Sequence, residues 1–318
     1  MANGSVNAPQ GAALPVAVPD ALAGPELRPG RVLVLGGGYT GLRFGRALAQ
    51  LGVPVVLSRR EPPEQPDASG LDWIGFDPDR GLIPDSTALD GTTHLLSTIP
   101  PNQAGRDPVL NHLGELLGDL PLAWVGYLST TGVYGDRGGG WVDEASPTNP
   151  GLERSRARLA CEAAWRQRGL PLQVFRLPAI YGPGRSPFAA LRQGTARLIH
   201  KSGQVFCRIH VDDIVGALLH NLALAPASRP STLILADNTP SPSSETLGYA
   251  AHLLGCGLPA FQSWAELEAS LSPMARSFWS ENRRVSSLLL QESLGYRLLY
   301  PSYREGYRAC LEEEEGGA

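Results

Sequence analysis

Three glycines with the spacing G-x-G-x-x-G stand between an apolar run and a stretch with helical periodicity, at Gly36, Gly38 and Gly41. The pattern is weak alone, but this strand-to-helix context makes it informative. Without Cβ atoms, Gly36 permits a tight turn, Gly38 lets the backbone approach a diphosphate, and Gly41 lets helix and strand pack closely. We predict that the N–H groups at the helix start, around Tyr39 and Thr40, bind a dinucleotide diphosphate; the alternative is a turn that binds nothing.

A second cluster of chemically capable side chains follows the next apolar run, in the sequence VVLSRRE. A site for NAD usually has an Asp or Glu at this point, which binds the ribose diol. Here the chain has Ser58, Arg59 and Arg60, and a guanidinium suits a 2′-phosphate through forked, charge-assisted hydrogen bonds. The sequence therefore favours NADP over NAD as cofactor, with the alternative that both arginines are solvated surface charges.

Further candidates come from the ends of other apolar runs, because ligands of open parallel sheets lie across the carboxyl ends of the strands. The residues predicted on this ground to border the cofactor are Asp77, Ser97, Thr98, Ile99, Pro100, Leu177 and Pro178. Those at 97–100 are expected beside the adenosine and the diphosphate, and those at 177–178 on the nicotinamide side. A turn-forming role is an equal alternative for Asp77.

Buried strands that end at one edge must position these residues. Near-continuous apolar runs predict strands at 31–35, 53–58, 71–77, 93–99, 122–129, 172–178 and 231–237. Helical spacing of apolar residues follows from about 40 to 51, after Asp107 with Pro108, and over 152–168. Strands that alternate with helices predict an α/β fold, a Rossmann-type doubly wound parallel sheet with helices on both faces.

The same pattern suggests a domain organisation. Residues 1–29, rich in Ala, Pro and Gly, are expected to form a disordered or loosely packed leader. A dinucleotide-binding Rossmann domain is expected over 30–181. A smaller C-terminal substrate-binding lobe is expected over 182–310, interleaved with late Rossmann elements such as the strand at 231–237. The acidic residues of 311–318 are expected to form a frayed tail.

Composition narrows the classes of partner. A net charge of −4 gives no reason to expect nucleic acid, and no apolar run has membrane-spanning length. No secretion signal is evident, and the four cysteines show neither pairing nor metal-ligand spacing, so we expect reduced thiols, a cytoplasmic location and no metal site. Of 27 basic residues only Lys201 is a lysine, which leaves one side chain for any chemistry that needs an amine.

At STTGVYGD (129–136) the chain resembles the extended short-chain dehydrogenase/reductases, also called the NAD-dependent epimerase/dehydratase family. The segments LPAIYGPGR (177–185) and HVDDI (210–214) agree with that family in order. The form GGGYTG resembles an atypical branch, whose members often lack a complete active site. The resemblance covers Arg31 to about residue 310. It implies an NAD(P)-dependent oxidoreductase or epimerase with a small carbonyl or sugar-like substrate, and a possible homodimer.

The resemblance also implies roles for active-site residues. It places Thr130 at the reacting oxygen of the substrate. The Tyr and Lys of the family's Y-x-x-x-K fall on Arg154 and Arg158, and Glu162 matches the acidic residue that follows. Arg154 stays protonated and cannot be the proton donor that Tyr would be, whereas Arg158 can still hydrogen-bond a ribose. Alternatively, the three residues form a salt-bridged ladder on one helix face.

Other groups are candidates for acid–base or substrate-binding roles. The phenols of Tyr134 and Tyr181 are expected near the nicotinamide, although both occupy family positions that are commonly structural. Arg208 and His210 are expected to point the same way, toward the substrate; the alternative is that His210 and Asp213 pin a loop. Two functions remain, an NADP(H)-dependent enzyme without the family's usual acid, or a non-catalytic NADP(H)-binding sensor or assembly protein.

Overall fold

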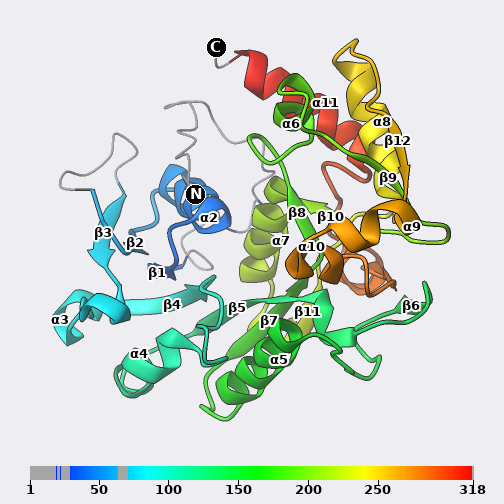
Figure 1. Cartoon of the computed structure of the whole chain (residues 1–318). Helices are drawn as coiled ribbons and strands as arrows, with labels where there is room; N and C mark the ends of the chain where they lie inside the picture. Colours follow the sequence, from blue (N-terminus) through cyan, green and yellow to red (C-terminus); the bar gives the residue numbers. More distant parts are fainter. Residues whose placement is uncertain (1–18, 20–21, 23–28, 64–70, 317–318) are drawn as a thin grey trace.

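A computed structural model describes Pro19, Leu22, residues 29–63 and residues 71–316. A seven-stranded, wholly parallel sheet of order β11-β7-β5-β4-β1-β2-β3 runs through the molecule (Figure 1). Its strands are β1 (Arg31–Leu35), β2 (Val55–Arg59), β3 (Asp72–Gly75), β4 (Thr92–Ser97), β5 (Trp124–Thr130), β7 (Leu172–Leu177) and β11 (Thr232–Ile234). The predicted Rossmann-type α/β fold is confirmed.

The strand order reverses at β1, which pairs with β2 on one side and β4 on the other. The register places Leu35 opposite Ser97, so β1 and β4 end side by side. In doubly wound sheets this reversal opens a crevice beyond the carboxyl ends of the strands, where ligands bind. The glycine-rich turn leaves β1 at this point and enters α2 (Tyr39–Gln50).

Alternation along β1 sends its side chains to two cores, as expected for a strand that is buried on both faces. Val32 and Val34 pack in one core with Phe44 of α2 and with α7 (Val211–Ala223). Leu33 and Leu35 pack in the other core with α4 (Pro108–Gly118) and α5 (Glu153–Arg166). In Figure 1, α2 and α7 accordingly lie on one side of the sheet and α4 and α5 on the other.

The segments after β7 form a lobe of short elements. They are β8 (Ala179–Tyr181), α6 (Phe188–Arg192), β9 (Leu198–His200), β10 (Arg208–His210), η3 (Pro226–Ser228), α8 (Ser243–Leu253), β12 (Phe261–Ser263), α9 (Trp264–Leu267), η4 (Glu268–Ser270), α10 (Pro273–Ser277), β13 (Arg284–Val285), the π-helical η5 (Leu289–Ser293) and α11 (Tyr303–Gly316). Earlier short elements are η1 (Pro78–Arg80), α3 (Ser86–Leu89), η2 (Thr131–Tyr134) and β6 (Trp141–Val142). Two-stranded parallel pairs β10-β8, β12-β9 and β13-β6 connect parts of the chain that are distant in sequence.

The prediction of a frayed acidic tail is wrong up to residue 316, because these residues continue helix α11. Glu313 and Glu314 of this helix form ion pairs at 2.7 and 2.8 Å with Arg43 and Arg192. The predicted leader lies almost wholly outside the described residues. Of its members, Leu22 is buried in the core that contains α2 and α7.

Two absences apply to the described part of the chain. Within 29–63 and 71–316, no helix combines the length and the apolar character needed to cross a bilayer. The same residues contain no group of three or more His, Cys, Asp or Glu side chains that is arranged to hold a metal ion.

Candidate cofactor site and active-site edge

The glycine-rich turn is held by its own backbone and by two neighbouring strand ends. Gly36 has φ of 105°, a conformation that favours glycine, and its N–H donates to Ser58 Oγ at 2.9 Å. Thr98 Oγ1 donates to the Gly36 carbonyl at 2.8 Å. A Cβ on Gly41 would lie 2.1 Å from that same carbonyl oxygen. Gly36 and Gly41 are therefore required by the turn itself, as the spacing predicts.

Gly38 differs, because a Cβ there would meet no atom of the described residues within 4 Å. It is the N-cap of α2, and the first internal helix bond runs from Leu42 N to Gly38 O at 2.8 Å. The first N–H groups of the helix, from Tyr39 and Thr40 onward, have no acceptor within the helix and carry its positive dipole end. Open space beside unpaired donors fits a dinucleotide diphosphate.

The predicted 2′-phosphate cluster divides into two parts. Ser58 is buried, and its hydroxyl accepts the Gly36 N–H, so the contact that the structure shows for Ser58 is support of the turn. Arg59 is exposed, and its guanidinium carbon lies 4.9 Å from the ring centre of Trp73. Arg60 is exposed, and no other residue that the structure describes forms a hydrogen bond or ion pair with it. Two guanidinium groups without an acidic partner among the described residues therefore stand at the end of β2.

The residues that end β3 and β4 have separate surroundings. Asp77 is buried in a tight turn, and its N–H donates to the Leu82 carbonyl at 2.7 Å. Asp77 thus has the turn-forming role that was the alternative to a cofactor contact. Ser97 is fully buried, so the prediction that it touches the cofactor is wrong. Thr98 bonds the glycine turn, while half-buried Ile99 and exposed Pro100 form the rim of the switch point. On the nicotinamide side, Leu177 is buried and Pro178 is half-buried.

Arg158 lies where the resemblance places the family's lysine. Its Nη1 donates to the Ile99 carbonyl at 3.3 Å, to the Leu128 carbonyl at 3.1 Å and to the Tyr127 hydroxyl at 3.1 Å. The half-buried guanidinium thus spans the carboxyl ends of β4 and β5. Thr130, which ends β5, is half-buried and accepts a hydrogen bond from Gly132 N at 3.0 Å.

Arg154, at the tyrosine position, contacts the C-terminal lobe. Its Nη1 donates to Ser277 Oγ at 2.5 Å, and its guanidinium carbon lies 4.9 Å from the ring centre of Phe278. Neither Arg154 nor Arg158 pairs with Glu162 in the described chain, so the ladder alternative is wrong. The place of the family's proton donor is occupied by a side chain that joins α5 to α10.

Tyr134 was a candidate acid, but its position contradicts that role. The residue is fully buried, and its hydroxyl accepts a hydrogen bond from Arg176 Nη1 at 2.9 Å. Burial raises the pKa of the Tyr134 phenol, and the nearby charge of Arg176 does not overcome this effect. The η2 turn directs the side chain into the core of the molecule, so its phenol is not available to a substrate.

Tyr181 and Arg208 are also interior residues. The Tyr181 hydroxyl donates to the Ser302 carbonyl at 3.3 Å, and its ring packs edge-on against Tyr307 at 5.5 Å. Arg208 Nη1 donates to the carbonyls of Phe206 and Ser241 at 2.9 and 3.3 Å. The prediction that these two side chains face the substrate is wrong, because both satisfy buried groups of the C-terminal lobe.

His210 has the structural role that was its alternative. Its Nδ1 accepts the Asp212 N–H at 3.2 Å and so caps α7. Burial first, and then the charge of Arg43, lower the pKa of His210 to about 3, so the ring is neutral at physiological pH. Asp213 accepts hydrogen bonds from the N–H groups of Leu299 and Tyr300 at 2.7 and 3.0 Å. The two residues pin a loop, and a substrate-binding role for His210 is contradicted.

Two buried ion clusters escaped prediction. Below the active-site edge, Glu162 pairs with Arg176 at 2.8 Å and accepts the Ser129 hydroxyl at 2.5 Å. Below the glycine turn, buried Arg43 of α2 pairs with Asp212 at 2.6 Å. The available signal was an arginine on the apolar face of each element, since a buried charge requires a partner. The identity of that partner is set by long-range contacts.

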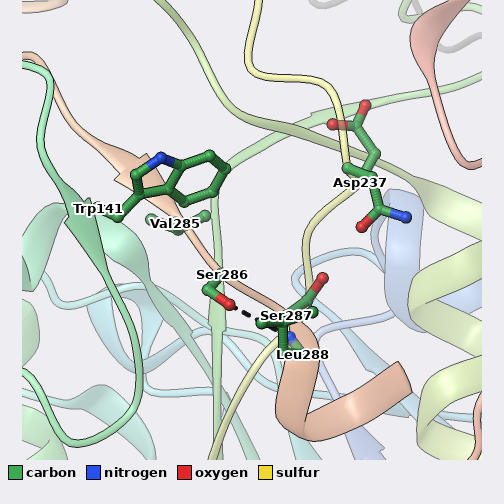
Figure 2. A pocket seen from close by; sticks show the side chains of 7 residues that line it. Trp141, Asp237, Val285, Ser286, Ser287 and Leu288 are labelled. Carbon is green, nitrogen blue, oxygen red and sulfur yellow. Dashed lines mark hydrogen bonds between the residues drawn. The ribbon is translucent and has the colours of Figure 1, made fainter. Parts of the chain in front are cut away.

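A cavity of about 430 Å³ lies elsewhere, next to the edge strand β11 (Figure 2). It is lined by Trp141, Asp237, Asn238, Val285, Ser286, Ser287 and Leu288. None of the predicted cofactor or substrate residues is among them. Burial raises the pKa of Asp237 to about 7, and within the described chain its Oδ2 has no hydrogen-bond partner.

The only lysine does not substitute for the missing catalytic lysine. Lys201 Nζ lies 5.1 Å from the ring centre of Trp264 and donates to the Trp279 carbonyl. Both partners belong to the C-terminal lobe. Arg158 is therefore the cation that this chain presents at the lysine position.

Comparison with known proteins identifies structural neighbours of the chain. No family model matches the chain, and no curated protein matches it. Among solved structures, a conserved protein of unknown function from Silicibacter pomeroyi is 43% identical over 90% of this chain and 99% of its own, with a TM-score of 0.81. A protein from Methylobacillus flagellatus, named for the NAD-dependent epimerase/dehydratases, is 26% identical over 90% and 99%, with a TM-score of 0.67.

The human epimerase family protein SDR39U1, whose structure contains NADPH, is 20% identical over 90% of this chain and 99% of its own, with a TM-score of 0.67. At that identity the likeness shows the fold. The sheet order, the glycine turn and the Thr130–Arg158 edge agree with the same assignment. The structural neighbours are NAD-dependent epimerase/dehydratases, that is, extended short-chain dehydrogenase/reductases, and they support the assignment of this chain as an atypical member of that group.

Proposed function

We propose that this protein binds NADP(H), with the diphosphate at Gly38 and the adenosine 2′-phosphate at Arg59 and Arg60. The observation that carries the proposal is the open space over Gly38, next to unpaired helix N–H groups. The two exposed arginines at the end of β2 have no acidic partner among residues 29–63 and 71–316, so a phosphate would supply the missing counter-charge. The human relative in the same fold holds NADPH, which is consistent with this proposal.

Calorimetric titration with NADPH and NADH tests the cofactor preference. We expect NADPH to bind the wild-type protein at least about tenfold more tightly than NADH, since charge-assisted hydrogen bonds contribute about 1.5–3 kcal/mol each. The variant Arg59→Gln/Arg60→Gln should lose this preference and keep its NADH affinity. Arg297→Gln, at an exposed residue far from the turn in sequence, is the matched control. Equal affinity of the wild type for both nucleotides would contradict the NADP assignment.

We further propose an oxidoreductase or epimerase reaction on a small carbonyl or sugar-like substrate. Bound NADP(H) would supply hydride transfer. Of the predicted catalytic groups, Thr130 ends β5 and Arg158 bonds the Leu128 carbonyl of the same strand, which supports a place for both at the rim of the proposed cofactor site. The Thr130 hydroxyl can donate a hydrogen bond to a carbonyl oxygen, and the Arg158 cation can stabilise negative charge there or bind a ribose. Neither residue replaces the family's tyrosine as proton donor, so the proton comes from water or the substrate.

The second candidate function is a non-catalytic NADP(H)-binding sensor or assembly protein. The burial of Tyr134 and Tyr181, together with Arg154 at the tyrosine position, favours it. NADPH oxidation with a panel of carbonyl and nucleotide-sugar substrates separates the two. For the enzyme we expect turnover that Thr130→Val lowers by about 100-fold, the size of effect seen when one oxyanion donor is removed. NADPH binding without turnover on any member of the panel would favour the sensor.

A further inference from the structure

The loop that follows β8 rests against the glycine turn. The Tyr39 hydroxyl, at the first residue of α2, donates to the Pro183 carbonyl at 2.9 Å. A Cβ on Gly182 would lie 2.4 Å from that hydroxyl, and Gly182 has φ of 154°, so the close approach depends on glycine. The guanidinium of Arg185 lies over the Tyr39 ring, 4.2 Å from its centre. An arginine from another segment is thereby fixed beside the first turn of α2.

Helix α11 holds the same loop from the other side. Glu314 Oε1 accepts hydrogen bonds from Gly184 N at 3.3 Å and from Ser186 Oγ at 3.2 Å, and Oε2 accepts from Arg192 of α6 at 2.8 Å. Figure 1 shows α11 beside α6 above the loop. The residues expected as a frayed tail therefore fix the position of Arg185.

The charge of Arg185 has no acidic counterpart in the part of the chain that the structure describes. Its neighbour Arg43 shows the contrast, because that guanidinium is neutralised by Asp212 at 2.6 Å and Glu313 at 2.7 Å. An exposed arginine is ordinary in itself. Arg185, however, is held by a ring stack next to backbone N–H groups that already suit an anion, so both point to the same ligand group.

We propose that Arg185 is a cofactor-binding residue that contacts the dinucleotide diphosphate, and that Glu314 positions it. The proposal rests on NADP(H) binding at the glycine turn. A guanidinium recognises a phosphate through forked, charge-assisted hydrogen bonds, which helix N–H groups alone do not supply. Arg185 approaches from a loop that follows the sheet's sixth strand in sequence, so it contacts the diphosphate from outside the glycine-rich sequence.

Three ligands locate the contact when each is titrated into the full-length wild type and into Arg185→Gln. NADPH has both the diphosphate and nicotinamide, 2′-phospho-ADP-ribose lacks nicotinamide, and 2′-AMP lacks both. Loss of a charged hydrogen-bond donor should weaken NADPH and 2′-phospho-ADP-ribose by about tenfold or more. The affinity for 2′-AMP should stay within about twofold, and Arg185→Lys should restore part of the loss.

The positioning role of Glu314 has its own test. Glu314→Gln should weaken NADPH by about threefold, while Glu315→Gln, its exposed neighbour on α11, should change nothing. In the double variant with Arg185→Gln, the Glu314 change should add no further loss, because it acts only through Arg185. An additive loss would overturn the positioning role, since an effect on helix packing alone does not depend on Arg185.

The outcomes separate this proposal from the one on which it rests. If the wild type fails to bind NADPH, the proposed function fails. If the wild type binds NADPH and Arg185→Gln binds 2′-phospho-ADP-ribose equally well, only the Arg185 assignment is overturned. Loss of NADPH affinity with unchanged 2′-phospho-ADP-ribose affinity also overturns it, because the contact would then lie at the nicotinamide end.

Discussion

The glycine turn and the N-terminal end of α5 both lie at the carboxyl edge of the sheet, but they differ in what remains available for a ligand. At the turn, open space and unpaired N–H groups stand ready above Gly38. At α5, Arg154 and Arg158 are bonded to the protein itself, to Ser277 and to the ends of β4 and β5. The turn depends on backbone geometry and the helix end on particular side chains, so the features proposed for binding do not depend on those proposed for catalysis.

The largest effect on NADPH affinity should come from a methyl group in the glycine turn. Substitutions at Gly38 and Gly41 separate the space proposed for the ligand from the packing of the turn itself. Gly38→Ala adds a methyl group that meets no atom of the described residues, but it takes the space of the proposed diphosphate. We expect NADPH affinity to fall by about 100-fold or more, with the free energy of unfolding changed by less than about 1 kcal/mol. Titration calorimetry and urea unfolding measure the two quantities.

Gly41→Ala is the counterpart of that variant. Its Cβ would lie 2.1 Å from the Gly36 carbonyl oxygen, so α2 must shift away from β1. We expect NADPH binding to be lost and the free energy of unfolding to fall by about 1–3 kcal/mol, as overpacking does. If Gly38→Ala and Gly41→Ala lost the same stability, the distinction between the ligand space and the turn's own packing would be wrong.

The next effect concerns stability below the α5 edge. Burial alone would raise the pKa of Glu162, but the hydrogen bonds and charge of Arg176 outweigh it and hold the pKa below its ordinary value. Glu162→Gln leaves Arg176 buried without its anion and should cost about 3–5 kcal/mol in urea unfolding at pH 7. Because the folded pKa is lowered, the contribution is present above the unfolded pKa and disappears as pH falls through the folded pKa.

NADPH affinity provides the contrast for Glu162→Gln. At a temperature where the variant stays folded, we expect its affinity to remain within about threefold of the wild-type value, since Glu162 is buried beneath the edge. A loss as large as that of Gly38→Ala would show that the two regions are coupled, and the comparison would fail.

Asp237 belongs to neither region. Its ionisation should make the free energy of unfolding depend on pH without involving the glycine turn or α5. Burial raises its pKa to about 7, whereas an unfolded Asp titrates near pH 4, so the folded state binds more protons between these values. Stability should therefore fall as pH rises from about 4 to 7. Asp237→Asn should remove part of that fall and stabilise the protein at pH 8 by about 2–4 kcal/mol. Unfolding curves at pH 4 and pH 8 test this, and equal effects at both would contradict it.

Tyr134→Phe should give the smallest effect and bears on catalysis. The change removes a hydrogen bond from Arg176 inside the core, which should cost about 1 kcal/mol of stability. With any substrate that is turned over, we expect kcat to stay within about twofold of wild type, because the phenol does not reach the site. A loss of about 100-fold in kcat would return Tyr134 to the position of catalytic acid.

The elements were readable from sequence because they carry local signals. Each of the seven apolar runs contributes a strand, and Pro108 begins α4 behind Asp107, which accepts the N–H groups of Val109 and Leu110. The C-terminal lobe lacked such signals. Strands β6 and β13 are each two residues long and pair Trp141 with Arg284, a contact that no local pattern encodes.

The part of the candidate site that depends on backbone conformation could be predicted from the sequence. The part that depends on the direction of side chains was less predictable. The glycine spacing identified the turn, because only glycine tolerates its contacts. Tyr134 was expected near the nicotinamide, but its place in the η2 turn after β5 sends the ring into the core. For Ser58, the alternation of side chains along the strand could not show that its hydroxyl would accept the hydrogen bond from Gly36 N.

Lys201 offers an experimental opening that follows from its place among aromatic residues. An amine-reactive label would meet a single ε-amino group, next to Trp264 and Trp279 in the C-terminal lobe. The fluorescence of a dye attached to this amine would depend on its distance from the neighbouring indoles, which quench it. The C-terminal lobe thus contains one natural attachment point for an amine-reactive dye.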